Sequence, residues 1–241
     1  MLTTKTTVAA DQLPVVTAFI SYSHVDRKFG WQAKEVLGEV GIPAFLAHED
    51  LEVSEDWRRR ILDELRSCDL FVPLLSKNFL VSQWAPQEAG FIASRPEVIV
   101  APLSIDGTTP FGFLSSYQST RIATAGITRA LLVAPLASRF PRIFLPGLIR
   151  IAARAGSFRQ AEELMEPLVP WFPIFTPQEA QALAVAATNN GQIWSASLCR
   201  ARYLPEFLSV QGNNIDPETL RALRYQVEND QRYPRDAKAE I

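Results

Sequence analysis

Apolar runs alternate with amphipathic segments over the first half of the chain. Short runs rich in Val, Ile, Leu and Phe have the length and composition of buried strands, and we predict strands at 15–20, 42–46, 70–75 and 98–103. A fifth short element, strand or helix, is expected near 120–123. The run at 70–75 is continuously apolar, as in a parallel strand that is covered on both faces.

Helical patterns lie between these runs. We predict helices over 27–40, where Gly41 provides the stop, over 57–68, and from about Pro86 onward. Strand–helix alternation with short loops indicates a parallel sheet with helices on both faces. The fold class predicted for residues 15–126 is therefore α/β, as a flavodoxin-like, five-stranded, doubly wound domain.

The pattern becomes helical from Ile127. Ser157 is placed to cap one helix, Thr176 and Glu179 have capping-box spacing before another, and Asp216-Pro217 opens a last one. We predict an all-helical C-terminal domain or extension over 127–231. Residues 1–14 are expected to be a flexible lead-in, and 232–241 a frayed tail.

Composition and charge narrow the range of functions and cellular locations that we expect. The formal net charge is −2 and the pI is about 5.8, which gives no electrostatic reason to expect nucleic-acid binding. The two cysteines lie far apart without metal-ligand spacing, as in a protein of the reducing cytosol. The N-terminus lacks the apolar core of a signal peptide, and the apolar stretch 130–151 is interrupted by Pro, Gly and Arg. We expect a cytoplasmic protein without membrane or metal.

One acidic residue follows the third strand. Glu88 falls in the first turn of the predicted helix, and open α/β folds place their chemistry at the carboxyl ends of strands. Trp84, four residues earlier, would share a face with it on a continuous helix. Glu88 either supports the helix N-terminus or performs chemistry, and the spacing alone does not choose. No GxGxxG and no P-loop sequence is present.

Several pieces of the first half resemble the Toll/interleukin receptor (TIR) domain, specifically its bacterial, NAD-cleaving branch. They occur in the family's order between Thr17 and Ile122, about half of the chain. The pieces are Ala18-Phe19-Ile20-Ser21-Tyr22-Ser23 with Asp26; Ala44-Phe45-Leu46 with His48-Glu49-Asp50-Leu51 and Trp57; and Phe79, Ser82, Trp84 and Gln87-Glu88. Val53-Ser54 stands where many members have Pro-Gly in the so-called BB loop.

The resemblance implies an enzyme, an NAD glycohydrolase that cleaves the nicotinamide–ribose bond with Glu88 as its catalytic residue. NAD would be the substrate, and no cofactor is implied. One acid suffices because nicotinamide leaves as a neutral molecule, so that only the positive charge on the ribose needs stabilisation. Attack by water gives ADP-ribose, and attack from the adenine side gives a cyclised product; the sequence does not decide between them.

Further substrate-binding candidates surround Glu88. Ser21, Tyr22 and Asp26 line the cleft or form a turn and helix cap, and Trp84 is either a wall of the site or part of the core. His48 and Asp50 belong to the BB loop, where His48 is expected to close over substrate or to contact a neighbouring protomer. Arg58, Arg59 and Arg60 are most simply a solvated helix face.

The resemblance also suggests a biological setting. It implies a bacterial immune effector in antiphage defence, activated by self-association through the TIR domain and triggered through the helical region. The alternatives are a non-catalytic TIR adaptor and a producer of a cyclic ADP-ribose-type signal for a separate effector. The trigger itself is not readable from the sequence.

Overall fold

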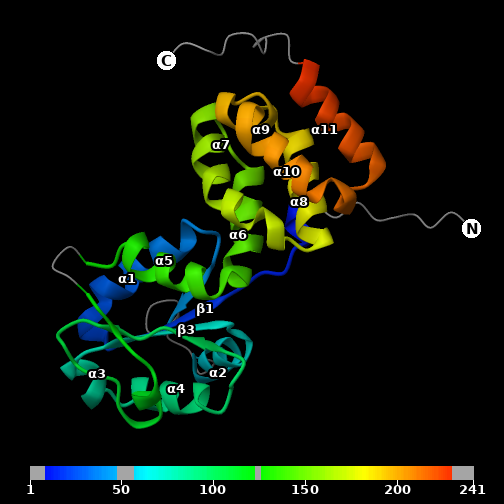
Figure 1. The fold of residues 1–241 in the computed structure, drawn as a ribbon. Helices are drawn as coiled ribbons and strands as arrows, with labels where there is room; N and C mark the ends of the chain where they lie inside the picture. The colour runs from blue at the N-terminus through cyan, green and yellow to red at the C-terminus, as the bar shows by residue number, and fades with distance from the viewer. Residues whose placement is uncertain (1–8, 48–56, 123–125, 230–241) are drawn as a thin grey trace, which may run out of the picture. The chain divides into compact units, whose positions relative to one another are not determined.

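The computed structural model describes residues 9–47, 57–122 and 126–229, and divides the chain into two compact units. One unit is Val15–Phe144, and the other joins Met1–Pro14 to Leu145–Ile241. Figure 1 shows the sheet in the first unit and the helices of the second.

A parallel sheet forms the first unit, and its strand order is β2-β1-β3-β5-β6. The strands are β1 (Ala18–Ser21), β2 (Ala44–Leu46), β3 (Leu70–Leu75), β4 (Ile99–Val100), β5 (Leu103–Ser104) and β6 (Thr120–Arg121). In the register, Phe19 lies opposite Phe45 on β2 and Phe71 on β3, and Ser21 lies opposite Pro73. The predicted α/β fold with a parallel, five-position sheet is confirmed.

The predicted fourth strand is divided into two short ones. β4 pairs with the beginning of β3 and β5 with its end, so both occupy one position in the sheet. Pro102 lies between them and has no N–H for the ladder, which accounts for the interruption. The fifth element is a strand, β6, paired with β5.

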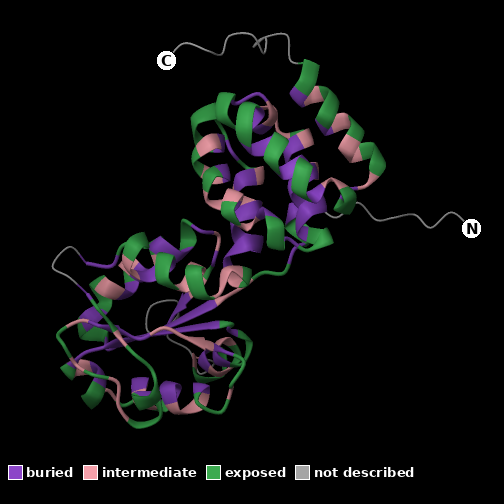
Figure 2. Ribbon diagram, viewed as in Figure 1, coloured by how far each residue is buried: buried purple, intermediate pink, exposed green. Residues whose placement is uncertain are grey.

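Helices cover both faces of this sheet. Figure 1 shows α1 (Arg27–Gly38) and α5 (Arg129–Arg139) on one side, and α2 (Trp57–Ser67), α3 (Lys77–Val81) and α4 (Ala85–Ile92) on the other. A core between the sheet and the α2–α4 side includes Phe19, Phe71, Phe79 and Ala89. In Figure 2 the strands are largely buried, whereas the helices expose their outer faces. The short helix α3 is not among the helices that the sequence predicts.

The division of the chain differs from the predicted boundary after residue 126. The structure keeps α5 in the sheet unit because this helix packs against α1. Leu132 and Val133 on α5 are buried, and the Ile127 N–H donates to Gln32 Oε1 at 3.1 Å. The division falls inside α6 (Pro141–Ala153).

The second unit is helical, as predicted. Its elements are α6, α7 (Phe158–Met165), a 3-10 helix (Glu166–Ile174), α8 (Pro177–Asn189), α9 (Gly191–Trp194), a π-helical segment (Cys199–Tyr203), α10 (Leu204–Gln211), a 3-10 turn (Gly212–Asn214) and α11 (Pro217–Asn229). The predicted caps are present: Ser157 caps α7, and Thr176 and Glu179 form the capping box of α8. Its core includes the ring contacts of Phe172 with Phe175 and Phe207.

The predicted lead-in is ordered where the structure describes it. Residues 10–12 form a 3-10 turn against α8, and Arg154 pairs with Asp11 at 2.9 Å. Ala10 and Leu13 are buried, which explains why this stretch belongs to the helical unit. The predicted tail 232–241 lies outside the described residues.

Within the described ranges, no single helix is both long and apolar enough to cross a membrane. By length and composition, α5 and α6 pass this test only when they are taken together as a bent pair.

Candidate active site

Glu88 lies at the carboxyl edge of the sheet, in the first turn of α4. Trp84 precedes the helix, Pro86 occupies an early position where its missing N–H is harmless, and the Glu88 N–H donates to the Trp84 carbonyl at 3.0 Å. The side chain turns inward and is only 2% exposed. Ser21, the last residue of β1, donates its hydroxyl to Glu88 Oε2 at 2.5 Å. Two residues 67 positions apart are thus joined by a short, buried hydrogen bond.

This environment makes Glu88 an unusual acid. Burial raises the pKa of its carboxyl from 4.5 to about 7, and the hydrogen bond from Ser21 partly opposes that rise. Its second oxygen, Oε1, is buried and has no hydrogen-bond partner among the residues that the structure describes. A carboxyl with one unused oxygen and a pKa near neutrality is available to bind a hydroxyl or to face a cation.

Ser21 and Tyr22 point in different directions although they are adjacent. Ser21 follows Phe19 by two residues, so it shares the face that α2 and α4 cover. Tyr22 is buried toward α1 and β2, because a Cβ on Gly30 would lie 3.4 Å from its ring and 3.3 Å from Leu46. The structure therefore brings Ser21, but not the Tyr22 ring, to the Glu88 carboxyl.

Asp26 is also buried, and its carboxylate faces another loop. Oδ2 accepts from Ser76 Oγ at 2.6 Å and Oδ1 from Asn78 Nδ2 at 3.3 Å. Asp26 precedes α1 but makes no side-chain cap bond to it. Asp26 therefore does not cap α1 through its side chain. It joins the segment after β1 to the segment after β3 by hydrogen bonds. The sequence did not single out Ser76 or Asn78, because α3, the helix that Ser76 caps, was itself not predicted.

Trp84 forms a half-buried aromatic pair. Its ring meets that of Trp57, the first residue of α2, edge to face with centroids 4.4 Å apart. This contact is typical of aromatic pairs that fix one another's orientation. Trp84 is therefore neither a fully buried core residue nor a free surface side chain, and it stands one helical turn before Glu88.

The remaining predicted site residues, His48 and Asp50, lie outside the described residues. In the part of the chain that is described, no three His, Cys, Asp or Glu side chains gather in a way that would hold a metal ion. The exposed arginines of α2 include Arg60, which pairs with Glu64 at 2.7 Å. Among the described residues, the groups that meet at the Glu88 carboxyl are this acid and the Ser21 hydroxyl.

The fold and the site define a class of protein: a doubly wound α/β domain with a glutamate, Glu88, buried at the carboxyl edge of its parallel sheet. Residues 18–130 match the family described as TIR domain, and this part of the chain is a TIR domain. No curated protein matches the chain in sequence.

A solved structure that is similar to this chain contains the TIR domains of the activated Roq1 resistosome directly recognizing the pathogen effector XopQ. The identity is 25%, the TM-score is 0.34, and the alignment covers 38% of this chain and 58% of that chain. This chain thus spans less than two thirds of the length of that protein.

Proposed function

We propose that this protein cleaves the nicotinamide–ribose bond of NAD, with Glu88 as the catalytic residue. The observation that carries the proposal is the buried Glu88 carboxyl, held by Ser21 at 2.5 Å and with Oε1 free of hydrogen-bond partners among the described residues. A carboxyl placed only to support a helix N-terminus has no need of burial at the edge of the sheet. The TIR domain over residues 18–130 supports the same assignment.

The reaction needs one acid rather than two. When the bond between the ribose carbon and the pyridinium nitrogen breaks, its electron pair neutralises the ring, and nicotinamide leaves without a proton. Positive charge builds on the ribose, and the Glu88 carboxylate opposes it across a short distance in a poorly solvated site. A water oxygen then bonds to the ribose carbon, and the proton that it loses passes to Glu88.

The pKa of about 7 fits this role in the substrate complex. At neutral pH the free protein holds Glu88 in both protonation states. The nicotinamide ring of NAD carries a positive charge, and an opposite charge nearby lowers a carboxyl pKa. Substrate binding would therefore favour the ionised form that the reaction requires, and the buried acid would be neutral more often when no substrate is present.

The decisive test compares NAD consumption by the full chain with that of Glu88→Gln. The substitution keeps the shape and removes the charge, and we expect at least a 100-fold loss, of the size found when a catalytic acid or base is removed (about 10²–10⁴). Glu97→Gln is the matched control, because Glu97 is a mostly exposed glutamate of the same unit, paired with Arg95. Equal turnover in Glu88→Gln and the unmodified protein would contradict the assignment.

The same assay addresses assembly and product. We propose that self-association through the TIR domain activates the enzyme in bacterial antiphage defence, with a trigger acting through the helical unit. Turnover per protomer should then rise with protein concentration. Separating the products by mass distinguishes ADP-ribose from a cyclised signal, and absence of turnover at every concentration, with the trigger absent or present, would favour a non-catalytic adaptor.

A further inference from the structure

We propose that the buried Asp26–Ser76–Asn78 cluster is a positioning device for Glu88: it fixes the segment after β1 and the start of α3, and through them the Ser21–Glu88 contact. This inference rests on the proposed function only where it predicts an effect on the turnover of NAD. The geometric part concerns the carboxyl of Glu88 and is testable without any substrate.

The cluster joins two segments that are far apart in the sequence. Asp26 is 8% exposed, and the residues that donate to it lie 50 and 52 positions further along the chain. Each carboxylate oxygen receives one of the two hydrogen bonds. A buried carboxylate whose two oxygens are both bonded to a single neighbouring segment holds that segment in one position, because losing either bond leaves a buried acceptor unsatisfied.

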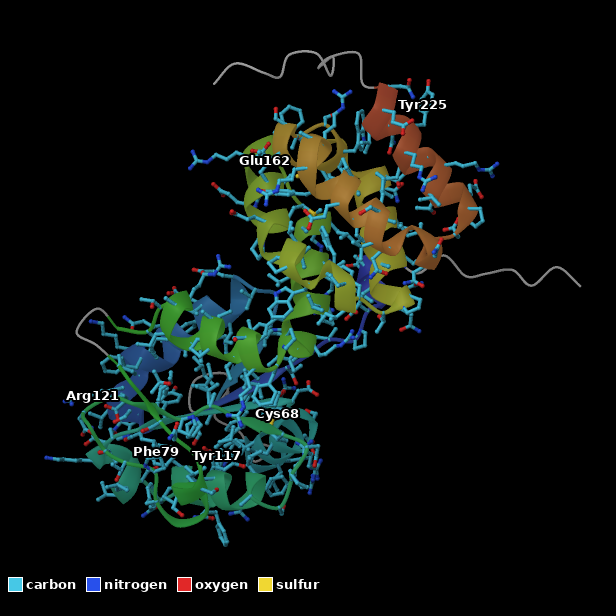
Figure 3. All side chains as sticks on the ribbon, in the orientation of Figure 1. Cys68, Phe79, Tyr117, Arg121, Glu162 and Tyr225 are labelled. Atoms are coloured by element: carbon cyan, nitrogen blue, oxygen red, sulfur yellow. The ribbon has the colours of Figure 1, made fainter. Side chains whose placement is uncertain are left out.

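Ser76 passes this constraint to α3. Its hydroxyl oxygen accepts from the Phe79 N–H at 3.0 Å and so caps α3, while its hydroxyl proton points toward Asp26. Phe79, labelled in Figure 3, is fully buried and belongs to the same core cluster as Ala85 and Ala89 of α4. The first turn of α3 is therefore anchored at both ends.

The link from α3 to α4 is short. Only residues 82–84 separate the two helices, and Ser82 Oγ accepts from the N–H groups of Trp84 and Ala85, both at 3.3 Å. Little freedom remains between the cap of α3 and the turn that carries Glu88. A displacement of α3 would thus move the Glu88 carboxyl relative to Ser21.

The stretch from Ser21 to Asp26 makes both contacts. Ser21, the last residue of β1, donates to Glu88 on α4, and Asp26, at the end of the segment that follows, accepts from Ser76, the cap of α3. The two contacts place one short segment against two consecutive helices. Releasing the Asp26 end frees the segment to shift, and the 2.5 Å contact at the Ser21 end depends on it.

The test follows the titration of the Glu88 carboxyl by carbon-13 NMR in the full chain. Ser76→Ala and Asn78→Ala leave every charge in place and remove one bond each. Loosening the Ser21 contact removes an interaction that favours the ionised form, so we expect the Glu88 pKa to rise by roughly 0.5 or more in Ser76→Ala, and in the same direction in Asn78→Ala. Ser21→Ala sets the upper limit of that rise.

Ser157→Ala provides the matched control. Ser157 caps α7 through Gln160 in the same way that Ser76 caps α3, but in the helical unit and without a carboxylate partner among the described residues. It should lose a comparable amount of helix-cap stability and leave the Glu88 titration unchanged. A Ser76→Ala protein that is destabilised like Ser157→Ala, with Glu88 titrating as in the unmodified chain, would overturn the proposal.

A further variant separates positioning from a charge effect. Asp26→Asn removes a negative charge, and this change by itself lowers the pKa of a neighbouring carboxyl. A fall in the Glu88 pKa would therefore indicate a charge effect and contradict positioning.

Asn78→Ala keeps the Ser76 cap of α3. If Ser76→Ala does not fold, the Glu88 titration in Asn78→Ala tests the positioning proposal instead. With NAD, we expect kcat in Asn78→Ala to fall several-fold with KM little changed. The Glu88 titration can be measured whether or not NAD is the substrate. The positioning proposal and the NAD-cleavage proposal can therefore be contradicted independently of each other.

Discussion

At the scale of single residues, burial of the Glu88 carboxyl lowers the stability of the folded protein above pH 4.5. An unfolded chain titrates this carboxyl near 4.5, whereas burial raises its pKa to about 7 in the folded protein. Below pH 4.5 the group is neutral in both states and there is no penalty. Above pH 7 it is charged in both states, and the folded state carries the cost of a buried charge. The stability contributed by the neutral form is therefore lost as the pH rises from 4.5 through 7.

The direction of this pH dependence of stability gives a prediction for Glu88→Gln that is independent of activity. The variant has no titrating group, so its free energy of unfolding should exceed that of the unmodified protein at pH 8 by up to about 3 kcal/mol, the equivalent of a pKa rise from 4.5 to about 7. The difference should shrink toward pH 4.5. Urea unfolding at several pH values measures it, with Glu97→Gln as the exposed control. A difference that grows toward low pH would contradict the burial argument.

The sequence singled out individual residues but not the pairs that they form. Glu88 was found because it follows a strand and opens a helix, and Ser21 because it ends a strand. The bond between them, and the bond from Ser76 to Asp26, depend on β1 and β3 being neighbours in the sheet. No local pattern encodes a contact across 50 or 67 residues. The direction of Tyr22, toward α1 rather than Glu88, likewise depends on the space that Gly30 leaves.

At the scale of elements, the prediction was most accurate where one physical signal dominated. The apolar run of β3 matches the strand residue for residue, and α1 and α4 begin at or within a residue of the expected positions. The division into β4 and β5 comes from Pro102, which a pattern of hydrophobicity alone does not reveal. Helix α3 was missed because its five residues are too few for a periodic pattern, and its stability comes from the Ser76 cap and from buried Phe79.

The turn into α5 contains a backbone position that favours glycine. Gly126 has φ = 85°, and a Cβ there would lie 2.5 Å from Gln32 Oε1. We expect Gly126→Ala to destabilise the protein by about 1–3 kcal/mol, because strained backbone and a displaced Gln32 add together. Gly38→Ala is the control: Gly38 is the last residue of α1, and a Cβ there meets nothing within 4 Å. It should be neutral or stabilising by up to about 1 kcal/mol. Thermal unfolding distinguishes the two, and equal effects would contradict the assigned strain.

At the scale of the whole molecule, the position of the division was the least predictable feature. The change from strand patterns to helical ones at residue 127 correctly marks where the sheet ends, but a change of secondary structure is not a change of unit. α5 is helical in sequence and yet belongs to the sheet unit, since its apolar side packs on α1. An amphipathic helix does not encode which neighbour it will cover, so the sequence left this assignment open.

This assignment predicts how fragments of the protein behave. A fragment of residues 15–144 retains α5, whereas residues 15–126 lose it together with the burial of Leu132 and Val133. Fully burying one such side chain stabilises a protein by about 1.5–3 kcal/mol, so the shorter fragment should be less stable by at least about 3 kcal/mol or fail to fold. Urea unfolding followed by circular dichroism compares the two. If residues 15–126 were as stable as residues 15–144, α5 would be dispensable to the sheet unit and the boundary would lie after residue 126. If the longer fragment alone folds and shows the same Glu88 titration as the full chain, the acid and its supporting contacts are properties of the sheet unit.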